Sequence, residues 1–299
     1  MSRFSNAKLN VLVAYPYFSQ STREVLEANA GTYRLIVDSG AFTAWNTGKE
    51  IKLDDYCAFL DTIAHLRPFH AVQLDVFGDP EASQRNYETM VSRGYDVMPV
   101  FTRGESPEQL EHLYTLTDYI MFGGIVIGGK NRNYIKWFVN ANKGRKAHWL
   151  GFVKMEFIKK FRPESVDSST WVNGARYGLF FAFNPKTGSH SWWKRETFAQ
   201  RPPEEVVTCL RAMHVPERAM RLLGLKDAWR ATTVPPAWTT THQYAPEPTS
   251  CHVLATMGHV HRMLWTEKVL GTKIYLAAGA HHTRVLFAAY NYGKHVGAW

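Results

Sequence analysis

The sequence predicts an α/β fold, namely a (β/α)8 barrel of the TIM type with a mainly helical C-terminal extension. Short apolar runs rich in β-branched and aromatic residues recur as far as residue 183, and a helix-compatible stretch follows each of them. Three of these runs end on an aspartate, and a fourth ends on a glycine pair. Regular alternation of strands and helices is typical of barrels and of doubly wound sheets, and eight strands favour the barrel. A doubly wound sheet is the structural alternative.

The elements follow in order along the chain. Helix signals include Asp79-Pro80-Glu81 and Ser106-Pro107-Glu108, where a capping residue precedes a proline at the first helical position. Strands are predicted at residues 9–15, 34–37, 71–76, 97–101, 119–122, 148–152, 165–166 and 177–183. Helices are predicted at residues 22–29, 53–66, 80–91, from 107 onward, 133–140 and 154–161.

The C-terminal third has a different pattern. A turn at residues 184–188 precedes a possible added strand at 191–196, and a Pro-rich linker begins at Arg201. Short helices are expected at 204–213 and 216–224, a Pro- and Thr-rich loop at 232–248, and two amphipathic helices at about 252–270 and 274–290. We therefore expect residues 1–200 to form the catalytic barrel and residues 201–299 to form a helical extension packed on it.

Composition indicates a cytoplasmic enzyme without a membrane span. No apolar stretch reaches the ~18 residues that cross a bilayer, and residues 1–8 lack the apolar core of a secretory signal. The three cysteines, Cys57, Cys209 and Cys251, are odd in number and widely spaced, which is typical of reduced thiols. If the protein is encoded by a phage, the expected location is the host cytoplasm.

The positive charge of the chain is divided between a block at residues 130–162 and the C-terminal remainder, and the block is the denser of the two. Residues 1–129 hold 10 Lys and Arg against 16 Asp and Glu, whereas residues 130–162 hold 10 against the single Glu156. Such a block can be a solvated helix face, but a local excess of this size favours a polyanion partner, because phosphate neutralisation releases counterions. The candidate nucleic-acid-binding residues are Arg132, Lys136, Arg145 and Lys146.

Carboxylates and glycines are expected to converge on one rim of the barrel. Asp38, Asp75 and Asp167 each stand where an apolar run meets turn residues, and Gly123-Gly124 stands at the end of a fourth run. Because the carboxyl ends of barrel strands meet on one face, this pattern predicts carboxylate chemistry on a flat polar ligand that approaches the backbone closely.

Four motifs in order resemble those of the tRNA-guanine transglycosylase superfamily. They are V-D-S-G-A-F at 37–42, G-G-I-V-I-G at 123–128, W-L-G at 149–151, and V-D-S-S followed by G-A-R-Y-G at 166–178. The resemblance covers nearly half of the chain and is closest to the DNA branch of the superfamily (DpdA type), which inserts 7-deazaguanines into DNA. It implies a TIM-like barrel and no cofactor. It also implies two partners: double-stranded DNA as the macromolecular substrate and a free, preQ0-like 7-deazaguanine base as the small one.

The resemblance also implies roles for single residues. Asp167 would be the nucleophile, Asp38 the general acid and base, and Asp75 the reader of the Watson–Crick edge. Gly123 and Gly124 would bind the region of the purine O6, and Phe42 would stack on the base. Each residue has a plainer alternative: a cap or turn for Asp167 and Asp38, a rim ion pair for Asp75, a β-bulge for the glycines, and core packing for Phe42. Asp79 is interpreted as a helix cap.

The chemistry asked of these residues is a glycosyl transfer. A carboxylate nucleophile splits base exchange at C1′ into two displacements through a covalent intermediate, and a second carboxyl group moves the proton of the leaving and incoming purines.

The sequence departs from the family in two places. Where the tRNA enzymes use a glutamine after the fourth strand, this chain has Thr102 and Arg103, so Arg103 is a further candidate for base binding. The closely spaced cysteines that hold a structural zinc in the tRNA enzymes are absent, and no metal site is predicted. The leading hypothesis is guanine exchange in DNA. The same exchange on tRNA, a hydrolytic N-glycosidase and a non-catalytic nucleic-acid-binding relative are the alternatives.

Overall fold

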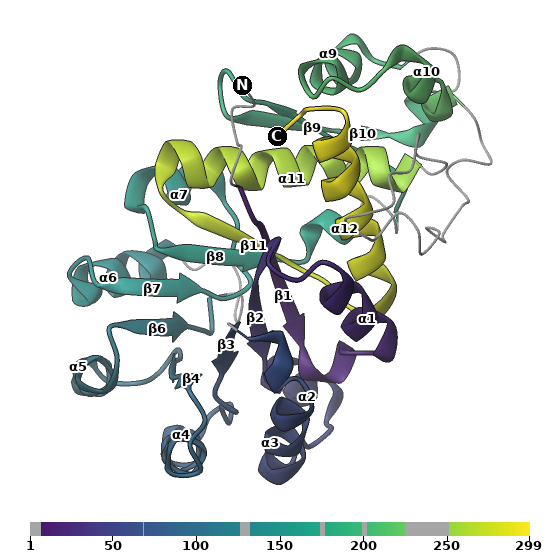
Figure 1. Ribbon diagram of the computed structural model, residues 1–299. Helices are drawn as coiled ribbons and strands as arrows, with labels where there is room; N and C mark the ends of the chain where they lie inside the picture. The colour runs from purple at the N-terminus through teal and green to yellow at the C-terminus, as the bar shows by residue number, and fades with distance from the viewer. Residues whose placement is uncertain (1–6, 68, 126–131, 174–176, 199–201, 225–250) are drawn as a thin grey trace.

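The computed structural model describes residues 7–67, 69–125, 132–173, 177–198, 202–224 and 251–299, and Figure 1 shows a strand-lined barrel surrounded by helices. The loop predicted at 232–248, part of the G-G-I-V-I-G motif and part of the G-A-R-Y-G motif lie outside the described residues.

All strands of the main sheet are parallel, and their order closes on itself. The order is β4-β3-β2-β1-β11-β8-β7-β6-β5, and its two ends, β4 and β5, are separated in the chain only by Pro99. Proline has no N–H to give to a ladder, so the strand is interrupted there, with β4 bonded to β3 and β5 bonded to β6. The eight strand positions of a TIM-like barrel are therefore filled, as predicted. The strands are β1 (Leu9–Ala14), β2 (Tyr33–Asp38), β3 (Phe69–Val72), β4 (Val97–Met98), β5 (Val100–Phe101), β6 (Tyr119–Phe122), β7 (Lys146–Trp149), β8 (Ser165–Ser168) and β11 (Lys273–Ala277).

The eighth strand was placed wrongly from the sequence. The segment expected to close the barrel at 177–183 instead forms β9 (Leu179–Asn184), which pairs antiparallel with β10 (Ser189–Lys194) in a separate hairpin. The closing strand is β11, which was expected to be helical and which bonds β8 on one side and β1 on the other. The barrel is therefore not contained in residues 1–200, because its last strand follows the extension.

Helices alternate with the strands, and two of the predicted caps are confirmed. Asp79 accepts a hydrogen bond from the N–H of Ala82, and Ser106 accepts one from the N–H of Gln109. The helices of the barrel are α1 (Gln20–Ala28), α2 (Ala41–Thr47), α3 (Leu53–Thr62), α4 (Pro80–Ser92), α5 (Pro107–Leu116), α6 (Arg132–Asn142), α7 (Met155–Phe161) and α12 (Ala280–His295).

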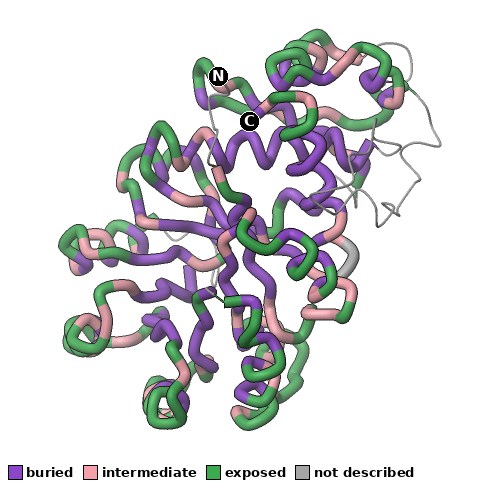
Figure 2. Tube along the Cα trace, in the orientation of Figure 1, coloured by how far each residue is buried: buried purple, intermediate pink, exposed green. Residues whose placement is uncertain are grey.

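The extension consists of the β9–β10 hairpin, α9 (Glu204–Ala212), α10 (Glu217–Met220) and α11 (Cys251–Leu270). Helix α11 contacts both β9 and β11, so it lies between the hairpin and the barrel (Figure 1). It is buried over most of its length, as the tube in Figure 2 shows. Its buried residues include polar ones, among them His252, His259, His261 and Arg262, so the burial follows from its position between two layers and not from an apolar sequence alone.

The interior of the barrel has its own apolar layer. It is separate from the larger core between strands and helices, and it consists of Leu12, Ile36, Val72, Met98, Val100, Met121 and Tyr275. Because side chains alternate along a strand, the residues two positions beyond this layer also point inward, at the carboxyl ends of the strands.

Candidate active site

Two of the predicted aspartates point into the mouth of the barrel. Strand register pairs Leu12 with Ile36, so Asp38, two residues further along β2, is also inward. Register pairs Asp167 of β8 with the inward Tyr275 of β11. Asp75 follows β3 by three residues and lines a pocket beside the mouth. The structure therefore brings the three predicted carboxylates to the same rim.

The turn after Asp38 explains the glycine of the D-S-G-A-F motif. Gly40 has a φ of +82°, and a Cβ there would lie 2.4 Å from Cδ of Pro16. The N–H of Gly40 donates to Oδ2 of Asp38 at 3.1 Å. The chain can therefore turn directly into α2 only with glycine at this position, and the same turn fixes the carboxylate.

Burial and mutual repulsion keep two of these carboxyl groups protonated to higher pH than usual. Burial raises the pKa of Asp38 to about 6, and the negative charge of Asp167 adds to the effect. Burial raises the pKa of Asp75 to about 7, and the charge of Asp38 contributes next. Carboxyl groups that titrate near neutrality can both give and accept a proton, which is what general acid and base catalysis requires.

Asp167 has a different environment, because hydrogen-bond donors reach it. Its Oδ1 accepts from the N–H of Gly151 at 2.7 Å and lies 3.1 Å from Nε2 of His148. In the described part of the chain, Oδ2 accepts no hydrogen bond. One oxygen is thus held in place while the other is left with its lone pairs available for attack.

His148 was not among the predicted site residues. It is fully buried on β7, and the strand alternation that makes Leu150 inward also makes His148 inward. Alternation along the W-L-G strand could have identified it, but nothing in the local sequence showed that β7 lies beside β8, the strand that carries Asp167.

His148 continues a chain of polar groups down the barrel interior. Its Nδ1 lies 2.5 Å from Oγ of Ser165, and that oxygen also bonds the hydroxyl of Tyr119. The chain is satisfied when Tyr119 donates to Ser165, Ser165 donates to Nδ1, and Nε2–H donates to Asp167. A hydrolase triad is a poor description of these residues, because Ser165 is fully buried and its oxygen is held between Tyr119 and His148.

The glycine pair at the end of β6 is only partly available to a ligand. Gly124 has a φ of +70°, and a Cβ there would lie 2.8 Å from Cβ and 2.9 Å from N of Arg103. The N–H of Gly123 donates to the carbonyl of Phe101 at 2.8 Å. Among the described residues, the N–H of Gly124 has no acceptor, so it is the member of the pair that could meet a purine oxygen.

Phe42 and Arg103 lie at the rim and outside the core. Phe42 is 42% exposed on α2, which removes the core-packing alternative. The Arg103 guanidinium lies over the ring of Tyr134, 5.6 Å from its centroid. Next to it, burial raises the pKa of Glu105 to about 7, and Oε2 of Glu105 accepts from the N–H of Thr102 at 3.0 Å. A third near-neutral carboxyl group therefore stands on the loop that departs from the family pattern.

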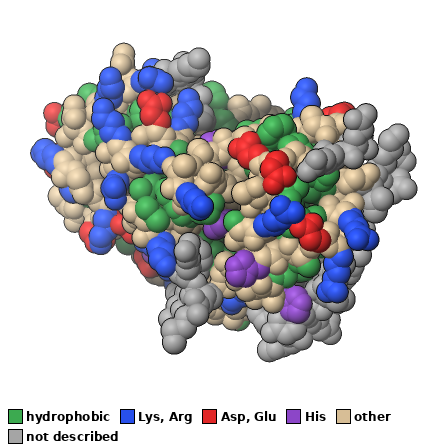
Figure 3. Space-filling view, turned by 90° about the horizontal axis from the view of Figure 1, so that it is seen from above, with side chains coloured by type: hydrophobic (Ala, Val, Ile, Leu, Met, Phe, Trp, Pro, Cys, Tyr) green, Lys and Arg blue, Asp and Glu red, His purple; other side chains and the backbone are tan. Residues whose placement is uncertain are grey.

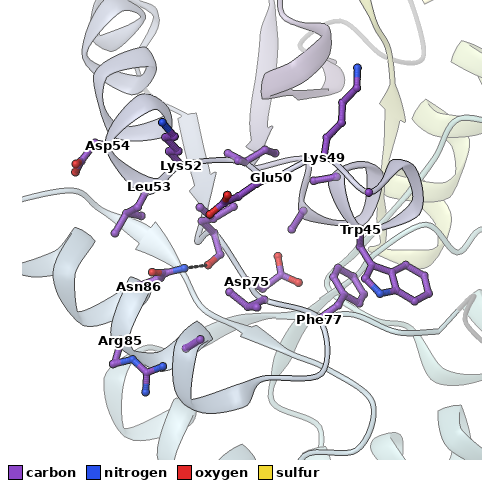
Figure 4. Close-up of a pocket in the computed structure, with 17 residues that line it drawn as sticks. Trp45, Lys49, Glu50, Lys52, Leu53, Asp54, Asp75, Phe77, Arg85 and Asn86 are labelled. Carbon is purple, nitrogen blue, oxygen red and sulfur yellow. Dashed lines mark hydrogen bonds between the residues drawn. The ribbon is translucent and has the colours of Figure 1, made fainter.

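A pocket of about 840 Å3 adjoins the carboxylates on the side of Asp75. The rings of Trp45 and Phe77 lie beside Asp75, and Arg85 and Asn86 lie on the other side of the pocket (Figure 4). Its size falls in the range of roughly 300–1,000 Å3 that is usual for small-molecule sites.

The predicted basic block is divided between the two ends of the barrel. Arg132 begins α6 at the carboxyl end, with Lys136 one turn further along. Arg145 and Lys146 lie beyond the other end of α6, roughly 16 Å away along the 11-residue helix. Arg145 is ion-paired to Glu111 at 2.7 Å and Lys146 to Asp118 at 2.6 Å. The structure therefore does not bring the four predicted nucleic-acid-binding residues together.

Other cations lie at the carboxyl rim. Arg103 follows β5, Lys154 precedes α7, and Lys49 and Lys52 line the pocket. On the face that Figure 3 shows, which is the side of the C-terminal extension, Lys and Arg side chains are interspersed with Asp and Glu.

Within the described residues, no group of three His, Cys, Asp or Glu side chains is arranged to hold a metal ion, and no helix is long and apolar enough to span a bilayer. The ring of His259, one of the histidines of α11, stacks on Phe181 with centroids 3.9 Å apart.

Comparisons with known proteins add no further information about function. Neither the family models, the curated proteins nor the solved structures contain a match to this chain.

Proposed function

We propose that this protein is a glycosyltransferase that exchanges guanine in DNA for a 7-deazaguanine through a covalent aspartyl intermediate. The main support is the contrast at the barrel mouth: Asp167 has one oxygen fixed by two donors, while Asp38 beside it titrates near neutrality. A nucleophile and an acid with separate environments are what a two-step glycosyl transfer needs.

In the first step, Oδ2 of Asp167 attacks C1′ and the bond from C1′ to the guanine nitrogen breaks. The electron pair leaves with the guanine, and Asp38 in its acid form supplies the proton that makes it a neutral leaving group. Oδ1 becomes the carbonyl oxygen of the resulting ester, and the N–H groups of Gly151 and His148 still point at it. The same donors that orient the nucleophile thus stabilise its product.

In the second step, the 7-deazaguanine gives a proton to Asp38, and its nitrogen attacks C1′ from the side that guanine left. The bond from C1′ to Asp167 breaks, and the carboxylate is restored. Two displacements retain the configuration at C1′.

Base recognition in this proposal combines Asp75, Gly124 and Phe42. A carboxylate suits the N–H donors of a guanine edge, a free backbone N–H suits O6, and a half-exposed aromatic ring suits the face of a purine. Arg103 and Glu105 stand where the family pattern is broken, so they are candidates to contact a substituent on position 7 of the incoming base.

DNA is proposed as the macromolecular substrate because the sequence lacks the cysteine cluster that supports tRNA docking in the resembling tRNA enzymes. A guanine inside a stacked duplex cannot reach a barrel mouth, so the target nucleotide must be extruded. Cations at the carboxyl rim are placed to hold the flanking phosphates.

The test is incubation of the purified protein with duplex DNA or tRNA and an isotope-labelled 7-deazaguanine, followed by nucleoside mass spectrometry. We expect label in DNA, and a protein–DNA adduct on a denaturing gel when a poor incoming base is used. Asp167→Asn should abolish both, because an amide cannot form the ester, whereas the exposed Asp118→Asn should change neither. An adduct that persists in Asp167→Asn would contradict the assignment of the nucleophile. Label in tRNA alone would support the tRNA alternative, and free guanine without any incoming base would indicate a hydrolase.

A further inference from the structure

A cluster of aromatic rings beside Asp75 has no role in the exchange reaction. Trp45 and Phe77 stack with centroids 5.4 Å apart and an interplanar angle of 21°. They come from different segments, Trp45 from α2 and Phe77 from the loop after β3, and Trp45 is 53% exposed. Large aromatic surface left in water next to a pocket is typical of a contact site.

The pocket that these rings border also has cations suited to a phosphate. Lys49 and Lys52 line it, and neither has a carboxylate within ion-pair distance in the described part of the chain. The charge of Asp54 is already compensated by Arg93 at 2.6 Å. Glu50 remains as an acceptor for the N–H groups of a base, because Asp75 is assigned to the exchanged guanine. The lining therefore offers a stacking surface, an acceptor for a base edge and cations for a phosphate, which together match the parts of a nucleotide.

We propose that this pocket is a second nucleotide subsite, which binds the nucleotide adjacent to the exchanged guanine on the same DNA strand. The base stacks on Trp45, and the phosphates on its two sides lie near Lys49 and Lys52, whose side chains stand on different sides of the pocket (Figure 4). This inference rests on the proposed function. Extrusion of the target guanine removes one stacking partner from its neighbour, and a protein aromatic ring replaces that partner.

The subsite predicts that a strand missing one neighbouring base binds less tightly. Three single-stranded oligonucleotides with a central guanine would be compared: one with an abasic residue directly 5′ of the guanine, one with it directly 3′, and one with no abasic residue. Binding would be measured by fluorescence anisotropy. For one of the two flanks, we expect the abasic residue to weaken binding to the wild-type protein by roughly 5- to 100-fold, which is the size of one base–aromatic stack.

Trp45→Ala tests whether that weakening occurs at this pocket. It should weaken binding of the intact oligonucleotide by a similar factor and make the protein indifferent to the abasic residue. Trp192→Ala is the matched control, because Trp192 is also exposed but lies on β10 of the hairpin. It should behave as wild type. Equal binding of all three oligonucleotides to wild type, or a full abasic effect in Trp45→Ala, would overturn the subsite.

The binding assay separates this inference from the proposed function. A wild-type protein that discriminates the abasic flank but exchanges no base keeps the subsite and refutes the transferase. One that exchanges bases without discriminating either flank keeps the transferase and refutes the subsite.

Discussion

Hydrogen bonding and burial give two similar aspartates different properties at the residue scale. Asp38 and Asp167 both stand at the carboxyl ends of strands, yet burial and a like charge raise the pKa of Asp38 to about 6, while Asp167 receives N–H groups from Gly151 and His148. Donors favour the charged carboxylate, and burial favours the neutral one. The two aspartates thus differ in what surrounds them, which is the contrast on which the proposed division of roles rests.

His148 should act on Asp167 through its Nε2–H. We expect His148→Leu to slow formation of the protein–DNA adduct by roughly 10- to 100-fold, which corresponds to the removal of a hydrogen bond to a charged group. His148→Gln should retain most of the rate, because its amide can also donate to Oδ1. Single-turnover kinetics would measure both variants, and KM should change little. If the two variants are equally slow, or if His148→Leu is as fast as wild type, His148 has no positioning role.

Asp75 should make the stability of the protein depend on pH. Its pKa of about 7 in the folded state lies above the ordinary 3.8, so the folded state binds the proton more tightly than the unfolded state. Stability should therefore fall as pH rises from about 4 through 7. Asp75→Asn removes this dependence, so we expect the variant to be more stable than wild type at pH 8 by roughly 1–3 kcal/mol and equal to it near pH 4.

Chemical denaturation at both pH values would measure the effect of Asp75→Asn. Asp55→Asn, an exposed carboxyl change on α3, is the control and should leave the pH dependence as in wild type. If the free energy of unfolding of wild type relative to Asp75→Asn rises from pH 5 to pH 8, the environment described for Asp75 is contradicted.

Local patterns predicted those elements whose surroundings are local. Asp79 and Ser106 each cap their own helix, and Asp38 ends a strand followed by a turn that only Gly40 allows. In each case the residues that decide the structure lie within a few positions of one another. The rim position of the three aspartates followed from the topology of a barrel, and the structure confirms that they meet there.

The elements that were predicted wrongly are those whose secondary structure depends on strands that are distant in the sequence. Residues 177–183 have the apolar pattern of a barrel strand, but the turn at 184–188 lets them pair with β10. The segment 273–277 was expected to belong to the following helix, and it becomes a strand because β1 and β8 leave a position open between them. His148 was missed for the same reason, since its partner Asp167 lies on the next strand and 19 residues away in sequence.

At the scale of the whole molecule, the basic residues that are close together in the sequence do not lie on one surface. The block at 130–162 runs along α6 and into β7, so it spans the barrel from end to end. Lys143, Arg145 and Lys146 at the amino end are paired with Glu111 and Asp118, whereas Arg103, Arg132 and Lys154 stand at the end that carries the aspartates. A DNA strand that presents a base to Asp167 can reach only the second set.

Replacement of these two sets of cations by glutamine should therefore have different effects on DNA binding. Changing Arg103, Arg132 and Lys154 should lower the slope of log affinity against log salt by roughly 0.7–0.9 for each phosphate that is no longer neutralised. Changing Lys143, Arg145 and Lys146 should leave the slope unchanged. Lys143 and Lys146 form exposed ion pairs worth about 0–1 kcal/mol each, whereas Arg145 is half-buried and also bonds the carbonyl of Asn142, so its replacement should account for most of any loss of stability. Titrations of a labelled duplex at several salt concentrations would measure both triple variants. A slope that falls only in the second variant would place the DNA across the amino end of the barrel, away from Asp167, and would refute the proposed active site together with the proposed path of the DNA.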